Sequence, residues 1–369
     1  MIISIFEKVE DFRMKGKCTY KLSELLTISF LTMLCGGEDY TDMSAFASER
    51  ARYFGLLSGC GKSVPSADTF ERVFKLLEPS SLTACFREAV YATIGTLMEK
   101  QIAIDGKKLC GSCPKERGTR GNYLLNAWVT ENGMMVAQEA LRDKENEIVA
   151  LPRLIESLQI AGAVISIDAI GAQRNVVKAI LKQNANFFIA VKENQAALLQ
   201  CIQDSFQLNK PSDTNIDVDI RGAHSRKVIR ECSILQADKM EDEAVRKKWP
   251  EVKTIVQIKS TMQNGNEEPV ETYRYYISNE DYPKAAYYNM LARGHWGIEN
   301  DLHWCLDVVF REDDCRARAG NASRNLSVIR KLALQFVKNH QDKASLKKRR
   351  FKAALNNEYL MNMLKCSSF

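Results

Sequence analysis

The stretch YNMLARGHWGIENDLHWCLDVVFREDDCRAR, residues 288–318, determines how the rest of the chain is interpreted. Its apolar spacing predicts a helix that leads into a charged segment. On a helical period His295, Glu299 and His303 stand on one face, with Trp296 beside them. An amphipathic core helix with solvated polar residues is the plain alternative. The density of metal-binding and stacking side chains favours a functional helix, provided that partner carboxylates lie elsewhere in the chain.

Two candidate partner carboxylates follow short apolar runs. Asp105 lies in QIAIDGKKL and Asp168 in AVISIDAIGAQ, and each precedes a small residue. This pattern predicts buried strands with an acid at their carboxyl ends, where α/β sheets carry their functional groups. Because an unpaired buried carboxylate is costly, the two acids and Glu299 together predict a shared cation.

Length and composition indicate a globular protein of two or three domains, with 369 residues, 45% hydrophobic and 27% charged. The apolar run LLTISFLTMLC (25–35) is too short to span a membrane and lacks the flank of a signal peptide. The eleven cysteines are scattered and odd in number, which favours free thiols in a reducing compartment. We therefore expect a cytoplasmic protein without a membrane partner, and we interpret the CGSC pair (110–113) as incidental.

The net charge of +6 is concentrated at the C-terminal end, where residues 340–369 hold seven Lys and Arg against two acids. The run KKRR (347–350) suits a phosphate backbone, because each neutralised phosphate releases counterions. It equally suits a solvated helix face. Charge alone leaves both interpretations open.

Residues 1–95 read as helices. We expect Ser23 to cap a helix over 24–35, and Thr41 or Asp42 to open a second one that ends near Gly59. Asp68 and Glu71 predict the start of a third, which Pro79 ends, and a fourth follows through FREAVYATIGTLMEK (86–100). Such short helices form either a DNA-binding bundle or a cap on a catalytic domain.

The period changes at residue 101. QIAIDGKKL, NYLLNAWVT and MMVAQEAL read as three successive strands, followed by alternating helix (146–158), strand (AVISIDA), helix (173–183) and strand (NFFIAV). This order predicts a mixed sheet covered by helices.

Residues 213–278 interrupt this alternation with a β-rich insertion. Two segments alternate with period two, and Asn264-Gly265 provides a hairpin turn. His224, Arg226 and Arg230 project from the insertion. They either protect an exposed strand edge or clamp a phosphate, and both interpretations stay open.

Over nearly its whole length, the chain resembles the DDE transposases of the H-repeat-associated, ISAs-type insertion-sequence family. The resemblance rests on AIDGK (103–107), SIDAIGAQ (166–173), AVKENQ (190–195), HxR (224–226), RYYIS (274–278), RGHWGIENDLHWCLDVVFREDDCRAR (293–318) and PSADTFERVFKLLEP (65–79). The string around Glu299 is long and specific. The chain departs from the Tyr/Arg/Glu/Lys pattern of related transposases, since it has His295 and Leu306 at the basic positions.

The resemblance implies an α/β, ribonuclease-H-like mixed sheet flanked by helices. The expected parts are an N-terminal helical transposase-associated domain (1–98), the first part of the catalytic domain (99–212), the β-strand insertion (213–280), and the catalytic helix with basic C-terminal helices (281–369). It also implies that Asp105, Asp168 and Glu299 are the DDE triad. They would hold two Mg²⁺ ions, for which Mn²⁺ can substitute. Asp105 would bridge both ions, Asp168 would bind one and Glu299 the other.

The expected function is metal-dependent cleavage of double-stranded DNA at the ends of a bacterial insertion sequence and strand transfer into a target, by a homodimer on the nucleoid. A nuclease or resolvase that cuts without joining, and an inactive DNA-binding remnant, are the alternatives. The candidate DNA contacts are Lys107, Lys192, Asn194, His224, Arg226, Arg230, Arg293, Trp296, His303, Arg316, Arg318, Lys347, Lys348, Arg349 and Arg350. Solvated lysines at 107 and 192, and core packing for Trp296 or Trp304, are the plain alternatives.

Overall fold

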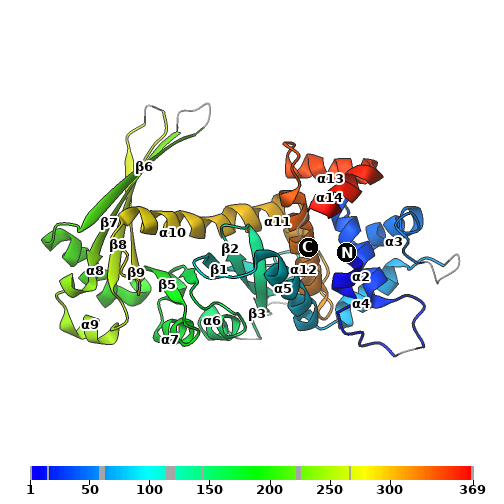
Figure 1. Ribbon diagram of the computed structural model, residues 1–369, viewed down its shortest axis with the longest axis horizontal. Helices are drawn as coiled ribbons and strands as arrows, with labels where there is room; N and C mark the ends of the chain where they lie inside the picture. Colours follow the sequence, from blue (N-terminus) through cyan, green and yellow to red (C-terminus); the bar gives the residue numbers. More distant parts are fainter. Residues whose placement is uncertain are drawn as a thin grey trace.

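The computed structural model describes residues 2–14, 16–57, 63–113, 121–142, 145–221, 226–265 and 267–366. The molecule is elongated (Figure 1). A β-rich arm stands at one end, a helical region that includes both termini stands at the other, and the sheet lies between them. No helix within these ranges is both long enough and apolar enough to cross a membrane.

The N-terminal region is helical, as predicted. Its helices are α1 (Ile2–Phe6), α2 (Leu22–Leu34), α3 (Tyr40–Glu49), α4 (Ala67–Leu76) and α5 (Pro79–Ile94). All of α2 except Glu24 is buried. It packs against α12 (Ala322–Asn339), where the Phe30 and Phe336 rings meet edge to face with centroids 5.0 Å apart. The N-terminal helices and the C-terminal part of the chain therefore share one core.

The predicted helix starts in this region were wrong in detail. Ser23 is buried inside α2, and the cap is Lys21, whose backbone N–H is accepted by Glu24. Asp39 caps α3 by accepting the N–H groups of Thr41 and Asp42. Pro79 does not merely end a helix but begins α5, because the first position of a helix needs no backbone N–H donor.

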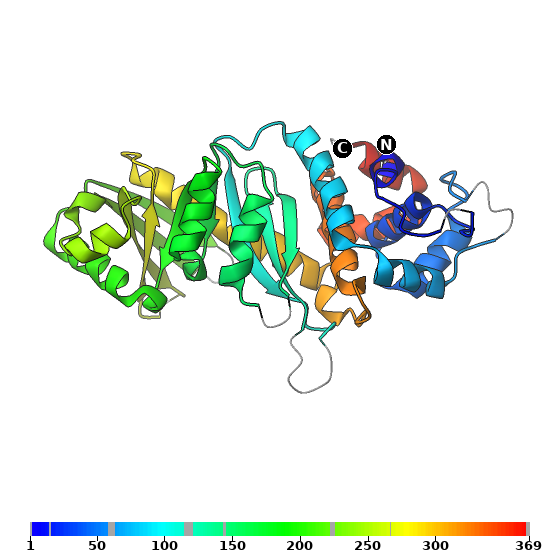
Figure 2. The same ribbon diagram turned by 90° about the horizontal axis from the view of Figure 1, so that it is seen from below.

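The central sheet follows the predicted order. Its first five strands are β1 (Gln101–Lys108), β2 (Tyr123–Val129), β3 (Met134–Ala140), β4 (Val164–Ile167) and β5 (Asn186–Val191). They lie in the order β3-β2-β1-β4-β5, with β2 antiparallel to its neighbours and β4 parallel to both β1 and β5. This is the ribonuclease-H-like arrangement. Helices α6 (Glu147–Glu156) and α7 (Arg174–Lys182) cover one face of it (Figure 2).

The insertion lies where the sequence predicts it but is continuous with the sheet. Its strands are β6 (Asp213–Arg221), β7 (Arg226–Gln236), β8 (Thr254–Gln263) and β9 (Val270–Ser278). Strand β9 pairs with β5, so a single sheet of nine strands results. Two helices were not predicted: α8 (Ala196–Leu208), which precedes β6, and α9 (Glu243–Lys248), which lies between β7 and β8. The domain boundaries at 98, 212 and 280 stay predictions.

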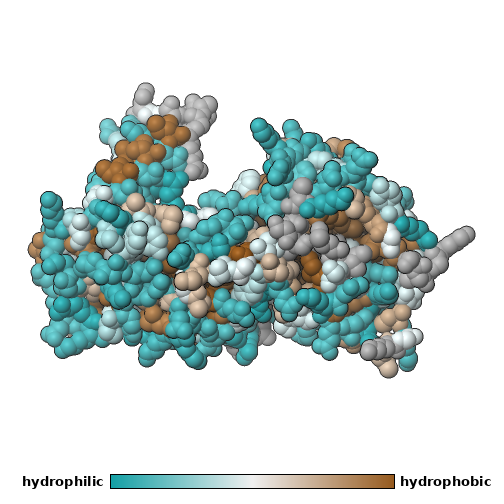
Figure 3. Space-filling view, viewed as in Figure 1, coloured by the Kyte–Doolittle hydropathy of each residue, from teal (hydrophilic) through white to brown (hydrophobic). Residues whose placement is uncertain are grey.

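The far ends of these strands form the projecting arm. Strand β6 is the outer edge of the sheet, and its alternate residues Ile216, Val218 and Ile220 are exposed. Figure 3 shows hydrophobic side chains gathered on this arm, and the molecular surface is hollowed between the arm and the C-terminal helices.

The predicted functional helix runs along the opposite face of the sheet from α6 and α7 (Figures 1 and 2). It consists of α10 (Ala285–Gly297), a π-helical turn η4 (Ile298–His303) and α11 (Trp304–Val308). Beneath α10 lies a second core that draws residues from β4 and β5 as well as from β7, β8 and β9. Helix α10 therefore packs both against the first part of the sheet and against the insertion. The chain ends in α12, α13 (Leu346–Leu355) and α14 (Asn357–Cys366).

Candidate active site

The sheet register places Asp105 and Asp168 side by side. Strands β1 and β4 are parallel neighbours, and Ile104 pairs with Ile167 in the last recorded step of their ladder. Asp105, the next residue of β1, and Asp168, the first residue after β4, therefore occupy neighbouring positions. The prediction that Asp105 ends its strand was wrong, because β1 continues to Lys108 by pairing with β2. Asp168 also caps the short helix η1 (Ala169–Gly171) by accepting the N–H of Ile170 at 3.1 Å.

Glu299 approaches the two aspartates from the π-helical turn η4, which contacts β1. An α-helix with a π turn carries an extra residue in that turn, and such turns are frequent at functional sites. Glu299 is exposed to solvent, whereas Ile298 and Leu302 of the same turn are buried. The turn therefore anchors itself on apolar side chains while it presents the carboxylate outward.

The charges of the three carboxylates act on one another. Desolvation raises the pKa of Glu299, and the charges of Asp105 and, less strongly, Asp168 raise it further. Burial raises the pKa of Asp168, and Asp105 adds to this rise. Burial also favours the neutral form of Asp105, but His303, the N–H of Gly106 and His295 outweigh it and lower the pKa of Asp105. A cation is the natural partner for such a set of mutually repelling carboxylates.

The donor chemistry of this set suits hard divalent cations, which prefer carboxylate oxygens. Among the residues that the structure describes, no three His, Cys, Asp or Glu side chains are grouped closely enough to hold one ion. A pair of ions does not require such a group. If Asp105 is shared, each ion takes only two protein carboxylates, and substrate phosphate and water complete its shell.

Both histidines of the helix point at the catalytic strands. His295 Nδ1 lies 3.2 Å from the hydroxyl of Ser166 on β4. His303 Nδ1 lies 3.4 Å from Oδ2 of Asp105, and its Nε2 lies 3.2 Å from the amide nitrogen of Asn126 on β2. Burial lowers the pKa of His295, against the opposing charges of Asp105 and Asp168. His303 therefore touches the candidate triad directly, and a contact with DNA is not its main role in this arrangement.

Lys107 is neither a phosphate contact nor a solvated lysine, which corrects both predictions. Its side chain is only 8% exposed, and its Nζ lies 2.6 Å from both carboxylate oxygens of Asp307 on α11. Asp313 lies 3.7 Å away. The ion pair joins β1 to the end of the Glu299 helix, so Lys107 holds the site together.

Trp296 and Trp304 are both at the surface, with 39% and 56% exposure, so the core-packing alternative is wrong for both. Arg274 of β9 stacks on Trp296, with its guanidinium carbon 4.5 Å from the ring centroid. The positive charge of Arg274 also lowers the pKa of Glu299 against the dominant upward effects. An exposed indole with an arginine beside the carboxylates offers a stacking surface for a base.

The segment after β5 lies beside Asp168. Lys192 is exposed, and its charge favours the ionised form of Asp168. Asn194 donates its side-chain N–H to the backbone carbonyl of Ala169 at 2.7 Å. Asn194 therefore fixes the loop that carries Asp168, while Lys192 stays exposed beside it.

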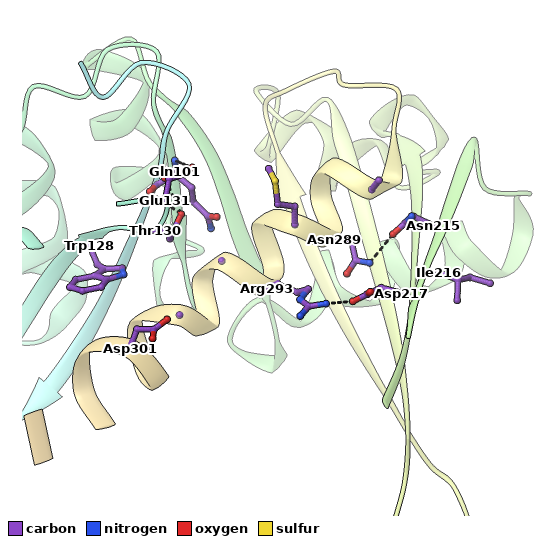
Figure 4. A pocket seen from close by; sticks show the side chains of 14 residues that line it. Gln101, Trp128, Thr130, Glu131, Asn215, Ile216, Asp217, Asn289, Arg293 and Asp301 are labelled. Atoms are coloured by element: carbon purple, nitrogen blue, oxygen red, sulfur yellow. Dashed lines mark hydrogen bonds and ion pairs between the residues drawn. The ribbon is translucent and has the colours of Figure 1, made fainter. Parts of the chain in front are cut away.

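The basic residues that were predicted to contact DNA at the arm lie in different surroundings. His224 lies outside the described residues, as does the side chain of Arg226. Arg230 lies within 4.0 Å of Asp217 and Asp219 on β6. Arg293 of α10 is also paired with Asp217 (Figure 4).

This pairing of Arg293 lies beside a groove of about 540 Å³ along α10 (Figure 4). Asn289 of the same helix donates to Asn215 on β6, so two side-chain bonds tie α10 to the arm. The charged residues that line the groove are Glu131, Asp217, Asp301 and Arg293. Acidic side chains outnumber basic ones in this groove, and Arg293 is already paired with Asp217. We therefore do not propose Arg293 as a DNA contact.

The C-terminal run KKRR divides into two kinds of residue. Lys347 and Lys348 are exposed. Arg349 donates to the backbone carbonyls of Val337, Lys338, His340 and Ala344.

Arg350 is only 5% exposed and donates to the carbonyls of Met33, Val309 and Gly37. It also stacks on Phe310, with 4.0 Å between the guanidinium carbon and the ring centroid. The prediction that Arg350 contacts DNA is therefore wrong. Arg318 donates to the carbonyls of Gly111 and Cys113, and Arg316 is exposed.

Three residues around Asp105 escaped the sequence analysis: Asn126, Gln138 and Lys331. All are buried. A polar residue at an inward position of the apolar strand NYLLNAWVT was the available signal for Asn126. Lys331 lies within a continuous buried run of α12, where a charged residue is unexpected.

Comparison with known proteins shows the family to which the chain belongs. Residues 96–336 match the family described as Transposase DDE domain, and residues 3–90 match the one described as DDE_Tnp_1-associated. The H repeat-associated putative transposase YhhI of Escherichia coli K12 is 31% identical, covering 96% of this chain and 95% of its own. The putative transposase YncI of Escherichia coli O157:H7 is 30% identical, covering 98% and 94%. A piggyBac transposase synaptic complex with hairpin DNA aligns with a TM-score of 0.40 and 13% identity, covering 99% of this chain and 78% of that one.

Proposed function

Because the chain belongs to the transposase DDE domain family, we propose that Asp105, Asp168 and Glu299 are the catalytic triad of a bacterial insertion-sequence transposase. The observation that carries this assignment is the register of β1 and β4. It sets the two aspartates next to each other, and the π-helical turn brings Glu299 within range of their charges. Three acids that lie far apart in the sequence are thus close enough for their charges to interact.

The cofactor we propose is a pair of Mg²⁺ ions, which Asp105, Asp168 and Glu299 would hold through their carboxylate oxygens. When bound, these ions supply an activated nucleophile and stabilise charge on the leaving oxygen. The protein contributes the positions of its ligands. Asp168 is fixed by the N–H of Ile170, Asp105 by His303, and Glu299 by the buried residues of its own turn.

The reaction we propose has two steps at the end of a mobile element. Water attacks the phosphorus, and the bond to the 3′ oxygen breaks and leaves a free 3′-OH. That 3′-OH then attacks a phosphodiester of the target DNA and displaces its 3′ oxygen. The partners are accordingly the element ends, the target DNA and a second copy of the chain that pairs the two ends.

The DNA contacts we propose are the exposed side chains around the triad and at the C-terminal end. Lys192 lies next to Asp168, and the stacked pair Arg274 and Trp296 lies next to Glu299. Arg316, Lys347 and Lys348 are exposed further along the chain. These residues combine positive charge with an aromatic face, which suits a backbone and an unpaired base.

The function is tested with labelled duplexes that carry the element ends, a supercoiled target plasmid and Mg²⁺. A transposase produces strands joined to the target. Hydrolysed ends without joined product indicate a nuclease or resolvase instead. Binding of the ends without any cleavage by the wild-type protein contradicts the catalytic assignment and indicates an inactive relative.

A further inference from the structure

A row of polar side chains crosses the sheet beside the candidate triad. Asp105 on β1 is opposite Asn126 on β2, and Asn126 is opposite Gln138 on β3. Residues directly opposite on adjacent strands point to the same face of the sheet. Two helices cover this row: α12 brings Lys331 to Asn126 and Gln138, and η4 brings His303 between Asn126 and Asp105. The row therefore forms one connected chain of contacts from Lys331 to Asp105.

The direction of each hydrogen bond in this chain of contacts follows from Lys331, the residue at which it begins. The Nζ of Lys331 has two side-chain oxygens as partners, and it can donate to both as an ammonium group or as a neutral amine. The oxygens of Asn126 and Gln138 must therefore face Lys331, as observed. Gln138 agrees independently, because its amide nitrogen donates to the carbonyl of Arg324.

The orientation of the Asn126 amide also determines its remaining hydrogen bonds. With its oxygen on Lys331, its NH₂ group donates to the carbonyl of Leu124 and faces Nε2 of His303 at 3.2 Å. Any form of the ring with hydrogen on Nε2 would set two donors face to face. The ring hydrogen then belongs on Nδ1, which lies 3.4 Å from Oδ2 of Asp105.

We propose that Lys331, through Asn126, holds His303 as the Nδ1–H tautomer and so makes it the positioning residue that orients Asp105 for cation binding. A lone pair on Nδ1 would repel the carboxylate, whereas an N–H attracts it. A carboxylate has about four lone-pair sites, so one bond at Oδ2 orients the group and leaves capacity for cations. Outer partners of this kind orient ligands in many metal sites. The inference rests on the proposed function only in naming Asp105 as a ligand.

The burial of the chain supports a dedicated role. Asn126 is completely buried, Lys331 is 2% exposed and Gln138 is 9% exposed. Buried polar groups are costly, and an apolar strand pair against an apolar helix would pack without them. The chain instead places a lysine that donates to Asn126 behind the histidine that contacts Asp105.

The test begins with the wild-type protein without metal. The chain has only four histidines, so ¹⁵N-labelled histidine and a long-range ¹H–¹⁵N spectrum resolve the tautomer of each ring, and His303→Gln identifies its signal. The proposal expects hydrogen on Nδ1 of His303. Hydrogen on Nε2 in the wild type overturns it.

The second measurement uses Asn126→Asp, which replaces the donor facing Nε2 by an acceptor while it keeps an oxygen for Lys331. Nε2 should then also carry a hydrogen, because both ring nitrogens face carboxylates. The Mg²⁺ concentration for half-maximal cleavage should rise about 10- to 100-fold, because the cationic ring competes with the metal at Asp105. The matched control is Asn325→Asp, an equally buried amide on α12 that binds the carbonyls of Phe74 and Leu77 instead. It should change neither the tautomer nor the Mg²⁺ dependence.

These outcomes separate the inference from the proposed function. If His303 carries hydrogen on Nε2 while Asp105→Ala abolishes cleavage, the inference fails alone. If the tautomer is as proposed but Asp105→Ala cleaves normally, the catalytic assignment fails and the polarity of the chain stands. If Asn126→Asp does not fold, the wild-type spectrum still decides the tautomer.

Discussion

Asp105 on β1 is the cross-strand neighbour of Asn126 on β2, and His303 contacts both side chains. Through the imidazole ring of His303, this arrangement connects the candidate metal ligand Asp105 to the buried side chain of Asn126. Since Asn126 is in turn bonded to Lys331 of α12, the position of Asp105 depends on a helix that follows the Glu299 helix in sequence. The candidate site is therefore supported from the sheet and from two helices.

Lys331 should make stability depend on pH. Its burial lowers the pKa from 10.5 to about 7, with Glu312 opposing the shift. Between these two values the folded state binds fewer protons than the unfolded state, so stability rises as pH rises through this window. One such group contributes up to about 1.4 kcal/mol per pH unit. We expect urea unfolding of the wild type to show this rise and Lys331→Met to lose it. The control Lys338→Met, which changes a partly buried lysine on the same helix that is paired with Asp301, should keep the wild-type slope.

Lys107 should matter for stability and not for DNA affinity. Lys107→Met leaves the half-buried carboxylate of Asp307 without its partner, and we expect the free energy of unfolding to fall by about 2 kcal/mol. Lys192→Met is the matched surface change, which should leave stability unchanged and weaken DNA binding. Equal loss of DNA affinity in the two variants, with stability intact, contradicts the structural role of Lys107.

The basic run of α13 should separate into two effects. Lys347→Gln with Lys348→Gln should weaken DNA binding and reduce the slope of log affinity against log salt by about 2, because each phosphate contact contributes about 0.9. Arg350→Met should instead destabilise the protein, because it removes the donor to the carbonyls of Met33 and Val309. Salt titrations and thermal unfolding of the two proteins distinguish these results. An unchanged salt slope in the lysine variant assigns those residues to solubility.

Trp296 should contribute to recognition of unpaired bases. Its ring is exposed and stacked with Arg274, so Trp296→Ala should change stability little. Loss of one stacked base costs about 1–3 kcal/mol. We therefore expect weaker binding of element ends with frayed termini and little change for fully paired duplexes. Trp304→Ala, a second exposed indole on the same helix, is the comparison, and identical behaviour of the two variants argues against a specific stacking site at Trp296.

Much of the catalytic sheet was predictable because its signals are local. The apolar runs before Asp105 and Asp168 predict strands, and these strands are present as β1, which continues past Asp105 to Lys108, and β4, which ends just before Asp168. The alternation of helix and strand then predicts the mixed sheet. Only the relative position of Asp105 and Asp168 needed the structure, because it depends on the parallel pairing of β1 with β4.

What escaped prediction depends on contacts between distant segments. The pairing of β9 with β5 makes the insertion part of the sheet, and no local pattern signals it. The four residues of KKRR look alike in sequence, yet Arg350 is buried because α13 packs near α2, which supplies the carbonyl of Met33. The π-helical turn at Glu299 was likewise not predicted, because the apolar spacing of the sequence indicates only a helix.

The most direct test of the triad is cleavage of labelled element-end DNA by Glu299→Gln in Mg²⁺. The matched control is Asp301→Asn, an exposed carboxylate in the same π-helical turn that is paired with Lys338. We expect Glu299→Gln to bind the ends and cut none of them, while Asp301→Asn cuts at close to the wild-type rate. Cleavage by Glu299→Gln at the wild-type rate would show that the three acids do not form the metal site.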